Sequence, residues 1–288
     1  MPSAVVDGIT TRYEVTGSGP PLLMFSPGGF DSRLENWSSH GRYAQLRLLS
    51  HLAERYTCIT FDRRESGQSG GRVERIGWTQ YVAQAVGLLD HLGIERAHLM
   101  GGCVGCSTAV ALAVARPARV LSLVLFSPAG GPRYRMLQHS RFGAHASFVD
   151  SYGLTSVVAL ARSSSPESSF AADPRVGPWV SVLRSDDAFA AAYTGQDRAE
   201  YLTLVDGMSQ LLFDRDTVPG AEPEDLMRLD IPALIVPGQD ASHATSAARY
   251  LQECLPRAEY WDVPVADQIE QATAARLLTF LDGIQTAP

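Results

Sequence analysis

The stretch Gly-Gly-Cys-Val-Gly at residues 101–105 constrains the fold of this chain more than any other part of the sequence. It lies between a short apolar run and a longer run of small residues, which predicts a sharp turn from a strand into a helix. Gly101 and Gly105 stand two residues before and two after Cys103, where such a turn leaves no room for a Cβ atom. We expect Cys103 to project from the sheet edge at a helix N-terminus, where the helix dipole favours a thiolate. The simpler alternative is a glycine-rich turn around a buried cysteine.

Composition and charge narrow the classes of function. The 288 residues are 45% hydrophobic and 19% charged, with a net charge of −7. The basic residues are scattered, which argues against nucleic acid or an anionic membrane as the main partner. No apolar stretch approaches the roughly 20 residues that cross a bilayer, and residues 1–13 lack the pattern of a signal peptide. Four cysteines are too few for a disulfide framework in a chain of this size. We therefore expect a cytoplasmic protein.

The first half of the chain alternates between β-rich apolar runs and helical patterns. Such alternation predicts right-handed βαβ crossovers and a mostly parallel sheet with helices on both faces. The expected strands lie at residues 9–15, 21–25, 56–61, 97–100 and 120–126, and the expected helices at 43–54, 79–92 and 108–115.

The pattern changes after residue 127. Residues 128–224 are alanine-rich and helical in pattern, with no strong strand. The sheet pattern resumes with expected strands at 233–236 and 259–263 and helices at 246–254 and 272–281. We therefore predict two domains: an α/β core made of residues 1–127 and 225–288, and a helical lobe of residues 128–224 inserted between two of its strands.

Four motifs in this order resemble the α/β-hydrolase fold superfamily: the loop at 26–29, the run at 62–69, the turn around Cys103, and the loop at 237–240. The resemblance implies an α/β-hydrolase core, with the helical lobe as a cap over it. The superfamily typically carries D-x-R-G-x-G-x-S at the second motif, and Glu65 stands here in place of its glycine. Arg63, Arg64 and Glu65 could face the site, although a surface ion pair is the favoured interpretation.

The resemblance also implies roles at the site. Cys103 would be the nucleophile, in a place where the superfamily uses serine, cysteine or aspartate. The backbone amide of Val104 would be one oxyanion donor, and the amide of Gly29 the other, with Phe30 as the alternative. Asp240 occupies the position of the triad acid, although Gly-Gln-Asp is also ordinary turn chemistry.

The histidine that the superfamily carries after its last strand is absent. Residues 263–268 contain none, and no histidine follows His243. Two substitutes are open. His243, three residues after Asp240, would serve as the base, or Asp267 or Gln268 at the vacated position would bind substrate or position a water, each being a poorer base near neutral pH.

Cys103 and Cys106 also form a C-x-x-C pattern that occurs in thiol–disulfide exchange proteins. The flanking glycines fit the strand-to-helix turn better, so we expect Cys106 to pack as a small apolar residue. The sequence contains no metal-ligand cluster, phosphate loop or dinucleotide fingerprint, and no cofactor is expected.

The sequence thus predicts a cofactor-independent hydrolase. Its Cys103 thiolate would attack an ester, thioester, lactone or activated C–C bond of a small apolar substrate. The alternatives are a non-hydrolytic enzyme on the same fold (a lyase, cyclase or acyltransferase) and a non-catalytic binding protein. The expected partner is a small molecule, and a homodimer remains open.

Overall fold

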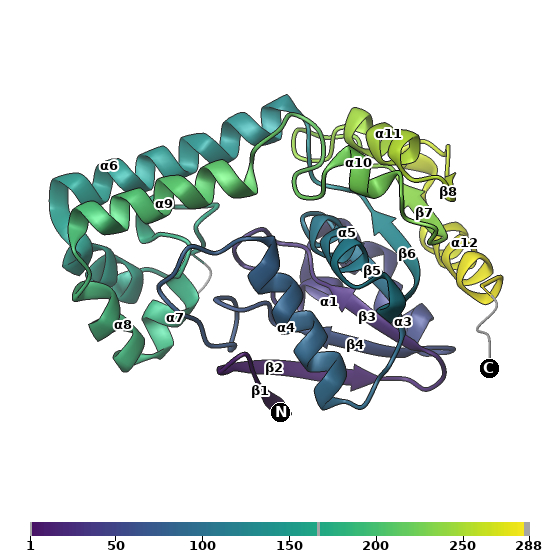
Figure 1. Ribbon diagram of the computed structural model, residues 1–288, viewed down its shortest axis with the longest axis horizontal. Coiled ribbons are helices and arrows are strands. Elements are labelled where there is room, and N and C mark those ends of the chain that lie inside the picture. The colour runs from purple at the N-terminus through teal and green to yellow at the C-terminus, as the bar shows by residue number, and fades with distance from the viewer. Residues whose placement is uncertain (1, 166–167, 285–288) are drawn as a thin grey trace.

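An eight-stranded sheet forms the centre of the molecule (Figure 1), which is seen here in a computed structural model that describes residues 2–165 and 168–284. The strand order is β1-β2-β4-β3-β5-β6-β7-β8. The edge strands β1 and β2 run antiparallel, and the six strands from β4 to β8 run parallel. The strands are β1 (Ser3–Val6), β2 (Ile9–Thr16), β3 (Pro21–Phe25), β4 (Thr57–Phe61), β5 (Ala97–Gly102), β6 (Val120–Phe126), β7 (Ala233–Val236) and β8 (Ala258–Tyr260). The predicted mostly parallel sheet with helices on both faces is confirmed.

Helices cover both faces of this sheet. Their bounds are α1 (Asn36–Ser39), α2 (Gly41–Leu46), α3 (Leu48–Ala53), α4 (Trp78–His91), α5 (Gly105–Ala115), α10 (Pro223–Leu226), α11 (Thr245–Cys254) and α12 (Glu270–Asp282). Two 3-10 turns, η1 (Pro117–Arg119) and η3 (Val265–Asp267), lie in the core, and a third, η2 (Pro174–Val176), packs on α6 of the insert described below. The helix expected over 43–54 is broken at Arg47, whose φ of 46° lies in the left-handed region. The two short helices α2 and α3 result.

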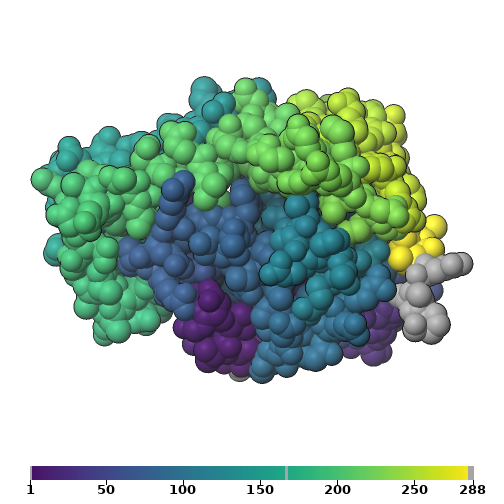
Figure 2. Space-filling model, in the orientation of Figure 1, coloured from purple at the N-terminus to yellow at the C-terminus, as the bar shows by residue number. Residues whose placement is uncertain are grey.

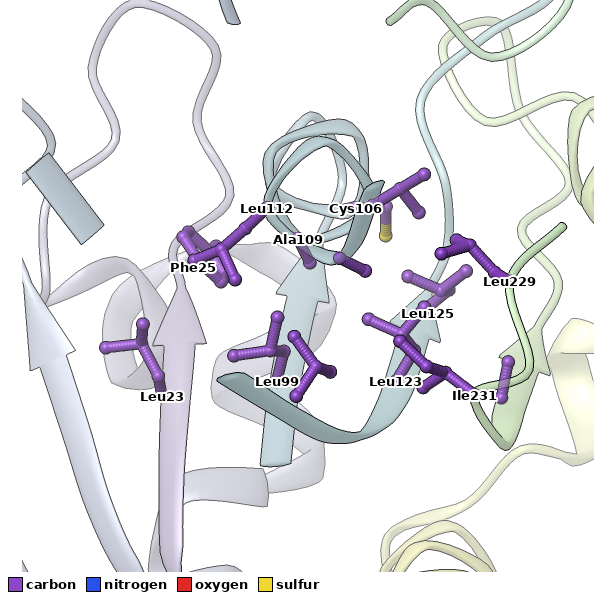
Figure 3. Close-up of a cluster of buried hydrophobic side chains, with 14 of the residues drawn as sticks. Leu23, Phe25, Leu99, Cys106, Ala109, Leu112, Leu123, Leu125, Leu229 and Ile231 are labelled. Atoms are coloured by element: carbon purple, nitrogen blue, oxygen red, sulfur yellow. The ribbon is translucent and has the colours of Figure 1, made fainter. Parts of the chain in front are cut away.

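Alternation along the central strands explains the two layers. Leu23, Leu99 and Leu125 join one buried cluster with α4, α5 and α11. Their sequence neighbours, such as Met24 and Met100, join a second cluster on the opposite face with α2, α3 and α12. Figure 3 shows side chains of the first cluster pointing from the strands toward α5. Because successive residues of a strand point to opposite faces, almost wholly apolar strands fill both layers.

A helical insert, defined here as residues 132–212, separates β6 from β7. It contains α6 (Pro132–Ser163), α7 (Val180–Ser185), α8 (Asp187–Thr194) and α9 (Arg198–Leu212), and α6 changes direction at Gly153. Figure 1 shows α6 and α9 running side by side beyond one end of the sheet. The boundaries predicted for the two domains, 1–127 with 225–288 and 128–224, stay predictions.

The insert packs on the core through a third buried cluster. This cluster joins Ile76, Tyr81 and Val104 of the core to aromatic and aliphatic residues of α6–α9. In the space-filling view of Figure 2, the green residues at the end of the insert lie over the blue and teal residues of the core. Within the described ranges, no helix is long and apolar enough to cross a membrane.

Candidate active site

The turn between β5 and α5 holds Cys103 in a strained conformation, with φ of 56°. A Cβ atom on Gly101 would lie 2.4 Å from the backbone nitrogen of Cys106, and one on Gly105 would lie 2.3 Å from the carbonyl oxygen of Phe25. Both distances are far shorter than a van der Waals contact. The two glycines are therefore needed for the chain to turn here, as the sequence predicts, and the turn places Cys103, partly exposed, at the start of α5.

The other cysteine of the C-x-x-C pattern is in a different environment. Cys106 is fully buried, and its Sγ donates to the carbonyl oxygen of Gly101 at 3.1 Å. Burial raises the pKa of the Cys106 thiol well above its ordinary value, and the nearby Cys103 adds to the shift. Cys106 is therefore a neutral, packed thiol beneath the helix.

Asp240 and His243 lie together on the loop between β7 and α11. The Nδ1 atom of His243 lies 2.8 Å from Oδ2 and 2.9 Å from Oδ1 of Asp240. The backbone amides of Ser242 and His243 also donate to Oδ1, at 2.8 and 3.0 Å. Partial burial acts to raise the pKa of Asp240, but these hydrogen bonds and the charge of His243 outweigh it and hold the pKa below its usual value. The Asp240 carboxylate therefore stays charged and orients the imidazole.

The far side of the imidazole faces Cys103. Burial acts to lower the pKa of His243, but the neighbouring Cys103 sulfur and the Asp240 carboxylate outweigh it and raise the pKa to about 9. The Nε2 atom is buried and makes no regular hydrogen bond within the described residues. The loop after β7 therefore holds an imidazole, paired with a carboxylate, close enough to Cys103 to interact with its sulfur.

Gln268, near the position where the superfamily carries its histidine, makes hydrogen bonds that hold neighbouring loops together. Gln268 is buried, and its Nε2 donates to the carbonyl oxygens of Pro237 at 3.1 Å and Val263 at 3.0 Å, while its Oε1 accepts from Arg42 at 2.8 Å. Asp267 is exposed on η3. Neither residue joins the pair of Asp240 and His243; Gln268 ties together the loops that follow β7 and β8.

Unpaired backbone amides lie in the loop after β3 and in the turn around Cys103, which is called the elbow from here on. The amides of Gly29, Phe30 and Val104 donate to no other group within the described chain, and these residues line one cleft. A Cβ atom on Gly29 would meet nothing within 4 Å. Open space therefore lies beside the backbone of Gly29, whose amide the sequence predicts as an oxyanion donor.

The cleft lies between the core and the helical insert and is narrow, with a cavity volume of about 10 Å³, close to that of one water molecule. Its walls are mainly aromatic and apolar, and α6 and α9 supply one side. The lining residues are Gly29, Phe30, Arg63, Trp78, Tyr81, Val104, Tyr134, Gln138, Leu212 and Phe213. Phe30, expected at the site from the sequence, lies in this wall.

Sequence reasoning missed two of the polar lining residues, Tyr81 and Tyr134, and gave Arg63 a place at the site only as the less favoured alternative. The expectation of a surface ion pair at Arg63, Arg64 and Glu65 is wrong, because all three side chains are buried. Arg64 does pair with Glu65, at 2.8 Å, but in the interior. The available signal was position: Arg63 follows a buried strand near the one that carries the elbow, and the ends of parallel strands share one edge of the sheet.

Metal ligands do not gather at the site. In the part of the chain that the structure describes, no group of three or more His, Cys, Asp or Glu side chains could hold a metal ion.

The sheet order, the elbow at Cys103 and the flanking helices define an α/β-hydrolase fold. A family profile described as alpha/beta hydrolase fold matches residues 21–149. The enol-lactonase from Burkholderia xenovorans LB400 superposes with a TM-score of 0.61 at 20% identity, covering 98% of this chain and 100% of that chain. MGS-M2, an alpha/beta hydrolase enzyme from a Medee basin deep-sea metagenome library, gives a TM-score of 0.64 at 18% identity, over 100% and 99%. Likeness at this level of identity establishes the fold.

Relatives of higher identity match part of the chain. The 2-hydroxy-6-oxononadienedioate/2-hydroxy-6-oxononatrienedioate hydrolase of Paraburkholderia phymatum is 55% identical over 126 residues, 43% of this chain and 42% of that protein. The dihydrolipoyllysine-residue acetyltransferase component of the acetoin cleaving system of Cupriavidus necator is 38% identical over 127 residues, 44% and 32% of the two chains. This chain therefore spans less than half the length of these curated relatives.

Proposed function

We propose that this protein is a cysteine hydrolase in which Cys103 attacks an acyl carbon, His243 moves the proton and Asp240 orients His243. One observation carries the proposal: His243 is paired with Asp240 through Nδ1 while its buried Nε2, on the side of Cys103, makes no hydrogen bond within the described residues. An oriented imidazole next to a nucleophile at a helix N-terminus is the arrangement that acyl transfer requires.

The proposed reaction has two halves. The Cys103 thiolate attacks the acyl carbon, and the developing oxyanion is stabilised by the amides of Gly29 and Val104. The bond to the leaving group breaks, the leaving group takes a proton from the His243 imidazolium, and a thioester on Cys103 remains. Water then gives a proton to neutral His243 and attacks the thioester, which releases the carboxylic acid and restores the thiolate and imidazolium.

The cleft and the relatives support a proposed substrate class. A mainly aromatic wall favours a small acyl compound with apolar surface. The names of similar proteins refer to hydrolases of 2-hydroxy-6-oxo dienoic acids and to an enol-lactonase. Lactones and activated C–C bonds are therefore proposed alongside esters and thioesters. We further propose that the helical insert acts as the cap over this cleft.

A panel of activated esters, thioesters and enol lactones, combined with intact-protein mass spectrometry, tests the proposal. We expect turnover in the wild type, loss of at least about 1,000-fold in Cys103→Ala, and an acyl adduct that accumulates on Cys103 in His243→Ala. Cys254→Ala is the matched control, because Cys254 is buried away from the cleft on α11.

Three outcomes would redirect the proposal. An adduct on Cys103 that is released only when a thiol or amine acceptor is added would indicate an acyltransferase. Full activity in Cys103→Ala would remove the nucleophile from the mechanism, and the absence of both adduct and turnover would favour a lyase or a binding protein.

A further inference from the structure

We infer that the guanidinium of Arg63 binds a carboxylate group carried by the substrate, so that the protein acts on acyl compounds that are also carboxylic acids. This inference rests on the proposed function of Cys103 and names the substrate class for that site.

Arg63 is a buried cation without an anionic partner. The residue is 8% exposed. Its side chain takes part in no ion pair and no hydrogen bond within the described residues, and its Nε is buried without an acceptor. The guanidinium instead lies over the rings of Tyr81, at 4.3 Å, and Phe30, at 5.5 Å. Burying an arginine without a counter-ion is costly, and the aromatic faces compensate only in part.

The neighbouring charges are engaged elsewhere. Asp62 accepts from the amides of Leu34 and Gln68, both at 2.8 Å, and pairs with Arg12 at 3.2 Å. The next arginine along the chain, Arg64, is paired with Glu65 and Glu74. Two adjacent buried arginines thus differ: Arg64 has its carboxylates from the protein, and Arg63 does not.

Glu65 does not neutralise Arg63. Its Oε1 accepts from Arg64 at 2.8 Å and faces the amide of Arg72. Burial raises the pKa of Glu65 to about 7, although the charges of Arg64 and Arg63 act to lower it. A carboxyl group that is partly neutral at physiological pH and bonded to another arginine leaves Arg63 available for an anion from outside.

The position of Arg63 connects it to the reacting atoms. It lines the same cleft as Gly29 and Val104, whose amides are proposed to hold the oxyanion, and it also lines the adjoining space beside Gly105 and Thr108. A planar guanidinium suits a carboxylate because it can donate two parallel hydrogen bonds. The cleft is small, so the acyl carbon and the bound carboxylate would be separated by a short chain of a few atoms.

A pair of matched substrates tests the inference: 4-nitrophenyl hydrogen glutarate, which carries a carboxylate, and its neutral methyl ester. We expect the wild type to prefer the acid, and Arg63→Met to lose at least about 30-fold in kcat/KM on the acid while changing less than about 3-fold on the ester. Arg228→Met, at an exposed arginine, is the control and should leave both rates unchanged.

Binding without turnover gives a second readout. Calorimetry of Cys103→Ala with glutarate should show binding that is lost when Arg63→Met is added. Removing an unpaired buried charge should not lower the melting temperature. If Arg63→Met does not fold, Arg63→Lys carries the same test, because it keeps the charge and loses the bidentate geometry, and should reduce the rate on the acid alone.

The inference about Arg63 and the proposed function of Cys103 are contradicted by different results. If the ester is hydrolysed through Cys103 but Arg63→Met changes both substrates equally or neither, the inference is overturned and the proposed function stands. If neither substrate is hydrolysed and Cys103 forms no adduct, the proposed function fails, and calorimetry with glutarate alone then decides whether Arg63 binds a carboxylate.

Discussion

His243 is held by contacts close to it in sequence or in the adjoining loop. Asp240 bonds its ring, and its backbone pairs with Gly130 after β6. A Cβ atom on Gly238 would lie 2.4 Å from the Cβ of His243, so the glycine makes room for the histidine to fold back toward the elbow. The ring orientation therefore depends on the β7–α11 loop and its neighbour, and not on the loop after β8.

The protonation of His243 gives a prediction for pH. Its pKa is about 9 in the folded protein against an ordinary 6.5, so the protonated form stabilises the fold. This contribution is complete below about pH 6.5 and is lost as pH rises through about 9. We expect Asp240→Asn to lower the pKa of His243 in an NMR titration, to weaken this pH dependence of stability, and to slow hydrolysis by about 10- to 100-fold.

Asp267→Asn is the matched control, because Asp267 is the exposed carboxylate at the position expected from the superfamily. It should leave both the titration and the rate unchanged. An unaltered His243 titration in Asp240→Asn would contradict the pairing of Asp240 with His243. A slower reaction in Asp267→Asn would indicate that the loop after β8 supplies the base.

At this scale the sequence nominated Cys103, Asp240 and His243 together but left the base open between two loops. Only the folded structure decides between the two loops, because the sequence around Gln268 does not show that its side-chain amide bonds to Pro237 and Val263. The burial of Arg63 was equally hidden, since an arginine after a strand is ordinarily exposed.

The elements around the elbow depend on close backbone approach. The Gly101 site meets backbone atoms of Gly105 and Cys106 at about the same short distance. Backbone atoms of the first turn of α5 cannot move aside as the end of a flexible side chain can. We expect Gly101→Ala to destabilise the protein by at least about 3 kcal/mol, measured by chemical denaturation.

Gly143→Ala on α6 is the control for the elbow substitution. Nothing lies within 4 Å of the Cβ atom that it would add. Alanine in place of glycine inside a helix should stabilise the protein by about 0.5–1 kcal/mol. A Gly101→Ala variant as stable as the wild type would show that the turn is not constrained as described.

Strands were the elements best predicted from the sequence, because the apolar runs at 21–25, 120–126 and 233–236 coincide with β3, β6 and β7. The break of the 43–54 helix at Arg47 was not predictable, since arginine rarely adopts a positive φ. The short edge strand β1 was also missed, because its four residues carry too little pattern.

Across the whole molecule, the insert and the core share one aromatic wall. Phe213, just after α9, is buried and lies 5.8 Å from Tyr134 and 6.5 Å from Phe30, measured between ring centroids. Its ring therefore joins the insert to a loop of the core at the cleft. The strand-free segment of the sequence predicted the insert. The shape of this wall could not be predicted, because it forms only when helices distant in sequence meet.

Shortening this side chain should enlarge the cleft. We expect Phe213→Ala to raise the relative kcat/KM for longer acyl chains and to cost about 3–5 kcal/mol of stability. An acyl chain-length series and thermal melts measure the two effects. Phe148 is a partly buried aromatic residue on α6 outside the cleft, and Phe148→Ala should leave the chain-length preference unchanged. A similar shift in both variants would show that Phe213 does not determine this preference.

The short distance in sequence between Asp240 and His243 has a consequence for how such a site could arise. In a triad whose members come from separate loops, the acid and the base must be aligned by the packing of several elements. Here one four-residue segment, Asp-Ala-Ser-His, carries the paired acid and imidazole and orients them with its own backbone amides. A related scaffold with the same β7–α11 loop, a glycine at position 238 and the neighbouring loop at Gly130 would therefore need only these four residues to acquire the pair.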